Sequence, residues 1–522
     1  MNRICLVLLA LSVFAAPILA TPPPHAGNPQ ILNAVEQISA DSILADITRL
    51  TQFQTRHTFS DTTSDSVGIG AALRWVRSKA AAYDTAGHFS YEFFPWSGDF
   101  QGDTYTRHIL IARASGTSGD GARYIIGGHI DSRTVNINDN TGIAPGADDN
   151  GSSSAALIEM LRLTQMPIAH DLELIWFTGE EQGLWGSAAY AQFLSQQGAR
   201  VDGMVAMDMI SHIALPSGAI DTVSFRLYAQ GDPGQGGTAS VSRSFQRYLK
   251  WVGEAYADID SFDMHIFAAS DRPGRGSDHL SFSGEGYPAV RVIERNEDTG
   301  FQHNPNDTPA HLSPPYARRI ARATYGALLT MLQAPARPPS PVVEQTSPTS
   351  MEITIPDSIV LPAGGRFYLA ARGWYDSYYI DIVDLGFDRT YDYTVISGQQ
   401  YAFAISRADS ADLPSPFSTE TVVDALAAHT RDAIIPEATR LTAAPNPFNS
   451  EVIFDVELTA SGPVALDIFD LLGRHVATVL NESLVPGSHR AAWTPANLST
   501  GIYLARLTTA DKIDILKIAY LR

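Results

Sequence analysis

The sequence predicts an α/β protein with a mainly parallel mixed sheet flanked by helices, followed by two small β-sandwich domains. Between residues 124 and 293, short apolar runs alternate with helical stretches, a pattern typical of strands joined by crossover helices. Beyond a proline-rich segment at 334–341, strand-like alternation replaces helical periodicity. At 522 residues, the chain is long enough for several domains.

The first twenty residues are typical of a secretory signal peptide. Arg3 supplies a positive charge, residues 4–16 form an apolar run, and small residues around Ala20 offer a cleavage site. The run falls short of the roughly 18 residues of a bilayer span, so we expect no integral membrane segment in the mature chain. Because Cys5 is the only cysteine, cleavage would leave no thiol, and any metal site must use His, Asp and Glu.

The elements of the first domain are predicted in chain order. Helical periodicity covers much of 33–83, and a further helix is expected at 154–163, after capping residues at Asn150 and Ser152. The strands of the sheet are expected at 124–130, 172–177, 204–209 and 289–293.

Prolines and alternating patterns divide the rest of the chain. The sandwich that follows resembles a fibronectin type III module in its last strands, around 401–405 and 414–418. The predicted boundaries are a signal peptide at 1–20, the α/β domain at 21–333, a linker at 334–349, the first sandwich at 350–428, a second linker at 429–440 and a terminal sandwich at 441–522.

The terminal unit resembles the C-terminal sorting domains of the type IX secretion system and the related FlgD-like immunoglobulin folds. The resemblance rests on an Ala-Pro-Asn-Pro-Phe-Asn opening at 444–449, a turn at 470–474 and a late strand entered at 499–507. It implies secretion or cell-surface location, with the bacterial secretion machinery as a partner. The alternative is a plain β-sandwich without a sorting role.

The charge balance excludes one class of partner. With 36 Lys and Arg against 56 Asp and Glu, the formal net charge is −20. Such a surface repels phosphate backbones, so we expect no nucleic-acid binding.

Three short segments carry candidate chemistry. His129 ends an apolar run, and Asp131, two residues on, can accept its ring N–H, although such a pair is often only structural. Asp148 and Asp149 precede a predicted helix, where they can bind a cation or cap the helix. A third pair, Glu180 and Glu181, follows a buried strand, where one can ligate while its neighbour faces a water; a solvated acidic turn is the alternative.

Two further residues complete the candidate set. Asp208 lies in an apolar run, where a carboxylate needs a metal or a paired partner. His303 lies in a loop and is uninformative by itself. The candidates fall mostly at the ends of successive predicted strands, where open α/β sheets build their sites.

The order of these residues resembles the zinc aminopeptidases of peptidase family M28. Further matches are Phe-Gln-Thr-Arg-His at 53–57, Ser-Asp-His-Leu-Ser-Phe at 277–282 and Gly-Tyr-Pro-Ala at 286–289. The resemblance implies a zinc exopeptidase fold and two zinc ions per chain. It implies that Asp149 bridges the ions, that His129 and Asp208 bind one and Glu181 and His303 the other, that Glu180 is the general base, and that Asp131 orients His129.

The implied activity is hydrolysis of peptide bonds, most simply by an aminopeptidase acting on peptides or proteins. The chain departs from the family pattern at Gln302, where many relatives place a tyrosine that stabilises the oxyanion. Two alternatives stay open: a glutaminyl-peptide cyclotransferase with one catalytic zinc, and an inactive surface protein whose β modules bind a partner.

Overall fold

The computed structural model describes residues 22–231, 240–259, 261–267, 276–297, 300–426, 438–495 and 498–521. The signal peptide predicted at 1–20 lies outside these residues. Within the described ranges, no helix combines the length and the apolar character that crossing a bilayer requires.

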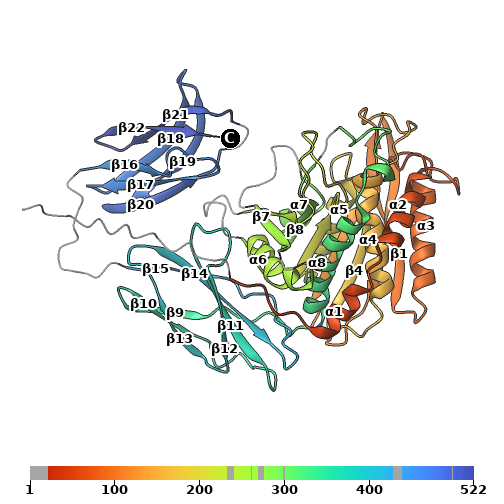
Figure 1. The fold of residues 1–522 in the computed structure, drawn as a ribbon, viewed down its shortest axis with the longest axis horizontal. Helices are drawn as coiled ribbons and strands as arrows, with labels where there is room; N and C mark the ends of the chain where they lie inside the picture. The colour runs from red at the N-terminus through yellow and green to blue at the C-terminus, as the bar shows by residue number, and fades with distance from the viewer. Residues whose placement is uncertain are drawn as a thin grey trace, which may run out of the picture.

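An eight-stranded sheet in the order β1-β2-β4-β3-β5-β8-β6-β7 forms the middle of the first domain (Figure 1). The strands β4, β3, β5 and β8 are mutually parallel, which confirms the mainly parallel centre. The β1–β2 hairpin adds antiparallel strands that the sequence analysis did not predict. The strands are β1 (Phe89–Phe100), β2 (Asp103–Ala114), β3 (Arg123–His129), β4 (Asp171–Phe177), β5 (Gly203–Met207), β6 (Ser224–Ala229), β7 (Asp263–Phe267) and β8 (Ala289–Glu294).

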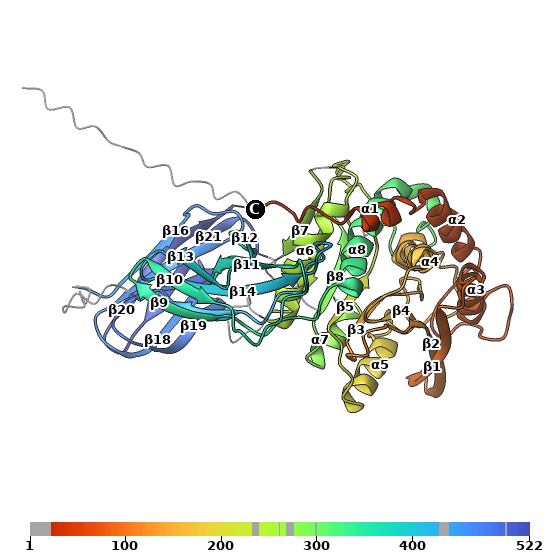
Figure 2. The same ribbon diagram turned by 90° about the horizontal axis from the view of Figure 1, so that it is seen from below.

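Helices cover both faces of this sheet (Figure 2). Alternate strand residues face opposite sides: Ile126 packs into the core shared with most of the helices, whereas Ile125 packs into the core that includes α5 and α7 residues. The helices are α1 (Pro29–Glu36), α2 (Ala40–Thr51), α3 (Gly68–Tyr83), α4 (Ser153–Leu163), α5 (Trp185–Gln196), α6 (Val241–Gly253), α7 (His279–Gly284) and α8 (Pro314–Gln333). Short helical turns occupy Ala147–Ser152, Glu254–Tyr256 and Pro309–His311.

The carboxyl ends of three parallel strands bring the predicted polar residues together. His129 is the last residue of β3, Asp208 follows β5 directly, and Glu180 lies three residues beyond the end of β4. Because these strands run in the same direction, their ends meet at one edge of the sheet.

Two antiparallel sheets follow the first domain, in the orders β13-β10-β9 and β12-β11-β14-β15. The linker predicted at 334–349 is too long, because β9 lies inside it and pairs with β10. Pro341 is the last proline of the segment, so the residues after it have the N–H groups that a ladder needs. The strands are β9 (Val342–Ser347), β10 (Ser350–Thr354), β11 (Arg366–Gly373), β12 (Asp381–Gly386), β13 (Thr390–Thr394), β14 (Gln400–Ala408) and β15 (Thr421–Asp424). The fibronectin type III likeness stays a prediction.

This first sandwich packs firmly against the α/β domain. Phe417 stacks on Trp251 of α6 with ring centroids 5.1 Å apart. Glu420 lies between two buried guanidinium groups, 2.7 Å from Arg372 and 3.2 Å from Arg247 of α6. One continuous apolar core therefore joins the two domains.

The terminal unit has two antiparallel sheets, β16-β17-β20 and β19-β18-β21-β22, around its own apolar core. A hydrogen bond from the Tyr375 hydroxyl to the Arg490 carbonyl, 2.7 Å long, connects it to the first sandwich. Most of the linker predicted at 429–440 lies outside the described residues, and its last residue begins a strand. The strands are β16 (Arg440–Ala444), β17 (Val452–Leu458), β18 (Gly462–Asp470), β19 (His475–Leu484), β20 (Gly487–Trp493), β21 (Gly501–Thr508) and β22 (Ile513–Tyr520).

Candidate metal centre

Three buried side chains form a first candidate metal-binding group. The Nε2 atom of His129 lies 3.3 Å from Oδ1 of Asp149 and 3.4 Å from Oδ1 of Asp208. These atoms lie close enough together to hold one ion. The three residues come from the end of β3, the turn before α4 and the end of β5.

A second group shares Asp149 with the first. The Nε2 atom of His303 lies 3.1 Å from Oδ2 of Asp149 and 3.2 Å from Oε2 of Glu181. Asp149 thus presents one carboxylate oxygen to each imidazole. The two groups are neighbours because a single side chain belongs to both.

The turn that carries Asp149 is held by side chains rather than by a helix cap. Asn150 donates from Nδ2 to the Met207 carbonyl and accepts from the Met209 amide, which fixes the turn to the end of β5. Ser152 is the N-cap residue of α4, and its side chain makes no capping hydrogen bond to that helix. Oδ1 of Asp148 accepts instead from the Ser211 amide, and the Asp149 oxygens face His129 and His303, so the capping interpretation of these two aspartates is wrong.

The consecutive glutamates take different positions. Glu180 is partly buried and lines the same cavity as the two groups. Glu181 uses Oε2 for an ion pair with Arg133 at 2.7 Å, while its Oε1 atom is buried and has no hydrogen-bond partner among the described residues. The alternative of a solvated acidic turn is wrong, because only 5% of the Glu181 side chain is exposed.

Asp131 meets His129 differently from the expected pairing. The Nδ1 atom of His129 lies 3.1 Å from the backbone carbonyl of Asp131 and 3.6 Å from its carboxylate Oδ1. The other carboxylate oxygen accepts hydrogen bonds from the Thr58 hydroxyl and the Glu181 amide. Asp131 therefore contacts the His129 ring mainly through its backbone carbonyl. Its carboxylate connects the segment after β3 to the segment after β4 that carries Glu181.

Buried carboxylates dominate the electrostatics of the site. Burial disfavours a cation at His129, yet Glu180, Asp131, Asp149 and Asp208 together raise the pKa of this imidazole well above its usual value. Burial likewise opposes the charge on His303, but Asp149 and Glu181 raise its pKa to about 9.

Glu180 holds its proton more tightly than an ordinary glutamate. Burial is the largest cause, and the neighbouring carboxylates of Asp208 and Glu181 add to it, so the pKa of Glu180 lies well above its usual value. A carboxyl group whose pKa is raised in this way is a candidate general acid–base.

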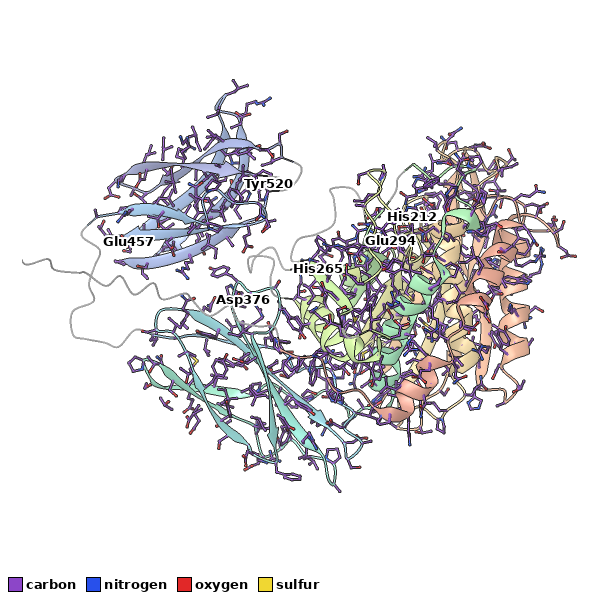
Figure 3. All side chains as sticks on the ribbon, in the orientation of Figure 1. His212, His265, Glu294, Asp376, Glu457 and Tyr520 are labelled. Carbon is purple, nitrogen blue, oxygen red and sulfur yellow. The ribbon has the colours of Figure 1, made fainter. Side chains whose placement is uncertain are left out.

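Further acidic residues line a small second cavity beside Asp149, together with His212 and Glu294, which Figure 3 labels. The carboxylate of Asp307 accepts hydrogen bonds from the amides of Asp148 at 2.8 Å and Asp149 at 3.1 Å. Burial, together with nearby Asp148, raises the pKa of Asp307 to about 8. Asp307 was not predicted from the sequence, because an acid in a polar loop gives no signal by itself.

Arg291 is the other residue that sequence reasoning missed. It lies on β8, fully buried, with Nη2 2.9 Å from Oδ2 of Asp208. An arginine inside the apolar run 289–293 is the signal that could have identified it, since a buried cation needs a buried partner. Gln302, at the departure from the family pattern, donates from Nε2 to Oδ2 of Asp149 at 2.7 Å.

A cavity of about 670 Å³ opens onto these residues. Its lining includes the five candidate ligands and Glu180, together with Arg133, Arg291, Gln302, Leu184 and Leu280. The space is large enough for a short peptide.

The donor set fits dications. Two imidazoles and three carboxylates supply only nitrogen and oxygen ligands, which suit zinc without thiolates. The partnerless Oε1 of Glu181 and the raised pKa values of both histidines indicate a cluster that lacks positive charge. Metal ions would supply that charge.

Comparisons with known proteins agree with this geometry. The model of peptidase family M28 matches residues 110–328. A "Probable zinc metalloprotease" of the fungus Pyrenophora teres f. teres is 30% identical over 353 residues, which cover 62% of this chain and 73% of the relative. The chain belongs to peptidase family M28. These findings confirm the resemblance, and they support a metallopeptidase with zinc as its metal.

Two further proteins are similar to this M28 chain. "Leucine aminopeptidase 1" of Arthroderma otae is 30% identical over 287 residues, covering 52% of this chain and 68% of the relative. The solved structure of an aminopeptidase from Aneurinibacillus sp. strain AM-1 is 16% identical, with a TM-score of 0.45 over 58% of this chain and 96% of that one.

The terminal unit has a match of its own. Residues 442–519 match the secretion system C-terminal sorting domain. The match confirms the resemblance of this unit to the sorting domains of type IX secretion and supports a secreted or cell-surface location.

Proposed function

We propose that this M28 protein is a secreted two-zinc aminopeptidase that removes N-terminal residues from peptides. The observation that carries the proposal is the shared carboxylate of Asp149, whose two oxygens face two separate imidazole–carboxylate groups. His129 and Asp208 would hold one ion, and Glu181 and His303 the other. When bound, zinc ions supply Lewis acidity that polarises the scissile carbonyl and acidifies the attacking water.

The chain's own residues move the protons. Glu180 accepts a proton from the water whose oxygen adds to the carbonyl carbon, and it delivers that proton to the leaving amine nitrogen as the C–N bond breaks. Its burial and raised pKa fit both halves of this task. Asp131 orients His129 through Nδ1, which leaves Nε2 facing Asp149 and Asp208.

Gln302 occupies the position where a tyrosine would stabilise the oxyanion. Its amide donates to Asp149, so we assign it to holding that carboxylate; bound zinc would then supply the oxyanion stabilisation. The similarity of this chain to "Leucine aminopeptidase 1" favours the aminopeptidase assignment over carboxypeptidase action.

The proposal is tested with a panel of aminoacyl anilides, with free and with acetylated amines, before and after chelation. We expect hydrolysis of the free-amine substrates only, lost on chelation and restored by zinc. Cyclisation of glutaminyl peptides without anilide hydrolysis would instead identify the cyclotransferase.

A further inference from the structure

Arg133 is the more accessible of two guanidinium groups that line the cavity among the described residues. Its side chain is 19% exposed, whereas that of Arg291 is 1% exposed and paired with Asp208. Arg133 donates from Nε to Glu181 and from Nη1 to the Thr134 carbonyl. Within the described part of the chain, no residue accepts a hydrogen bond from its Nη2.

The charge of Arg133 distinguishes between the two ends of a short peptide in this cavity. Arg133 repels an ammonium group and attracts a carboxylate, so the end of a short peptide that it favours is the C-terminal one. A planar guanidinium with an open N–H group is the side chain best suited to bind a carboxylate.

The position of Arg133 sets the length of such a peptide. Its Nε atom lies 2.7 Å from Oε2 of Glu181, and the same oxygen lies 3.2 Å from Nε2 of His303. Arg133 is therefore in direct contact with a side chain of the second candidate metal-binding group. An extended residue spans about 3.5 Å, so the guanidinium is within reach of a group one or two residues beyond the scissile bond.

From this geometry we propose that Arg133 binds the terminal carboxylate of di- and tripeptides, on the leaving-group side of the cavity. The preferred substrates are then short peptides with a free C-terminus. This inference rests on the proposed function and narrows its substrate class.

The kinetic test compares leucyl-glycine with leucyl-glycinamide, which differ only in the terminal charge. For the wild-type enzyme we expect kcat/KM to be about tenfold or more higher for the free acid, as a charge-assisted hydrogen bond predicts. Arg133→Gln should bring the ratio close to one, and Arg133→Lys should restore part of it. Arg200→Gln, which removes a surface cation paired with Asp202, should leave the ratio unchanged.

The ratio of kcat/KM for the acid to that for the amide distinguishes two roles of Arg133: binding the substrate carboxylate, and holding Glu181 in place. If Arg133 only holds Glu181, the substitution lowers both rates equally and the ratio persists, which overturns the proposal. Equal rates for acid and amide in the wild type overturn it as well. Failure of the proposed function looks different, because the wild type would then hydrolyse neither dipeptide.

Equilibrium binding gives a readout that does not depend on turnover. Calorimetry with the zinc-loaded Glu180→Gln protein should show tighter binding of leucyl-glycine than of leucyl-glycinamide by about tenfold. Adding Arg133→Gln to this protein should remove the difference. Equal affinities before that second substitution contradict the proposal.

Discussion

The carboxylate of Asp307 accepts a hydrogen bond from the backbone amide of Asp149 at 3.1 Å. Asp307 lies four residues after His303, so this contact joins the loop that carries one candidate ligand to the turn that carries the shared one. The two candidate metal-binding groups are thereby connected through one carboxylate. Buried contacts of this kind fix ligand positions before any metal arrives.

Replacing the proposed general base should separate catalysis from metal binding. Glu180→Gln keeps the size of the side chain but removes its ability to take a proton, so kcat should fall by about 10² or more. Zinc content should stay at the wild-type level, because Glu180 belongs to neither metal-binding group. Near wild-type turnover by this variant would mean that another group is the base.

Zinc affinity should depend on pH through the histidines. Without metal, the pKa of His303 is about 9, so at neutral pH zinc must displace a proton from this ring. Metal-free protein thus binds more protons than loaded protein, and the apparent Kd for zinc should fall as pH rises from 6 to 9. Competition with a chelator of known affinity measures this Kd. A Kd that is constant across that range would contradict the description of the site.

The buried ion cluster between the α/β domain and the first sandwich should be important for stability. Glu420→Gln leaves the buried guanidiniums of Arg247 and Arg372 without their carboxylate and should cost about 3–5 kcal/mol of unfolding free energy. Denaturant unfolding measures the loss. The matched control is Asp384→Asn, which removes an exposed pair with Arg366 and should cost at most about 1 kcal/mol. If the two substitutions lower the free energy of unfolding equally, the ion cluster between the domains contributes no more than an exposed surface pair.

Export should depend on the terminal unit, and catalysis should not. Its apolar core consists of its own residues, and the candidate ligands all lie before residue 304. Deletion of residues 441–522 should leave a folded, active peptidase in the periplasm, and fractionation followed by an anilide assay measures where the activity lies. A truncated enzyme that reaches the medium as efficiently as the full chain would exclude a sorting role, whereas loss of activity in the purified protein would indicate a structural one.

The sequence was most informative where periodicity and chemistry coincide. Apolar runs at 124–130 and 172–177 anticipated β3 and β4, because buried parallel strands read as continuous apolar segments. The candidate metal-binding side chains at their ends were identified through residue types and order. The β1–β2 hairpin was missed because its strands mix exposed and buried positions.

Most of the other features that the sequence analysis did not predict are contacts between residues far apart in the sequence. Asp307 and Arg291 act on Asp149 and Asp208, which are far away in the sequence. The packing of Phe417 on Trp251 likewise joins segments that composition assigned to separate domains. No local pattern encodes such pairs, so they became visible only in the folded chain.

The stoichiometry of bound zinc tests the central claim most directly. Elemental analysis of the purified full chain should return two zinc ions per molecule. The Asp149→Asn variant should retain at most one, since it alters the carboxylate that both groups share. One firmly bound ion in the wild-type protein, with full peptidase activity, would contradict the two-metal account.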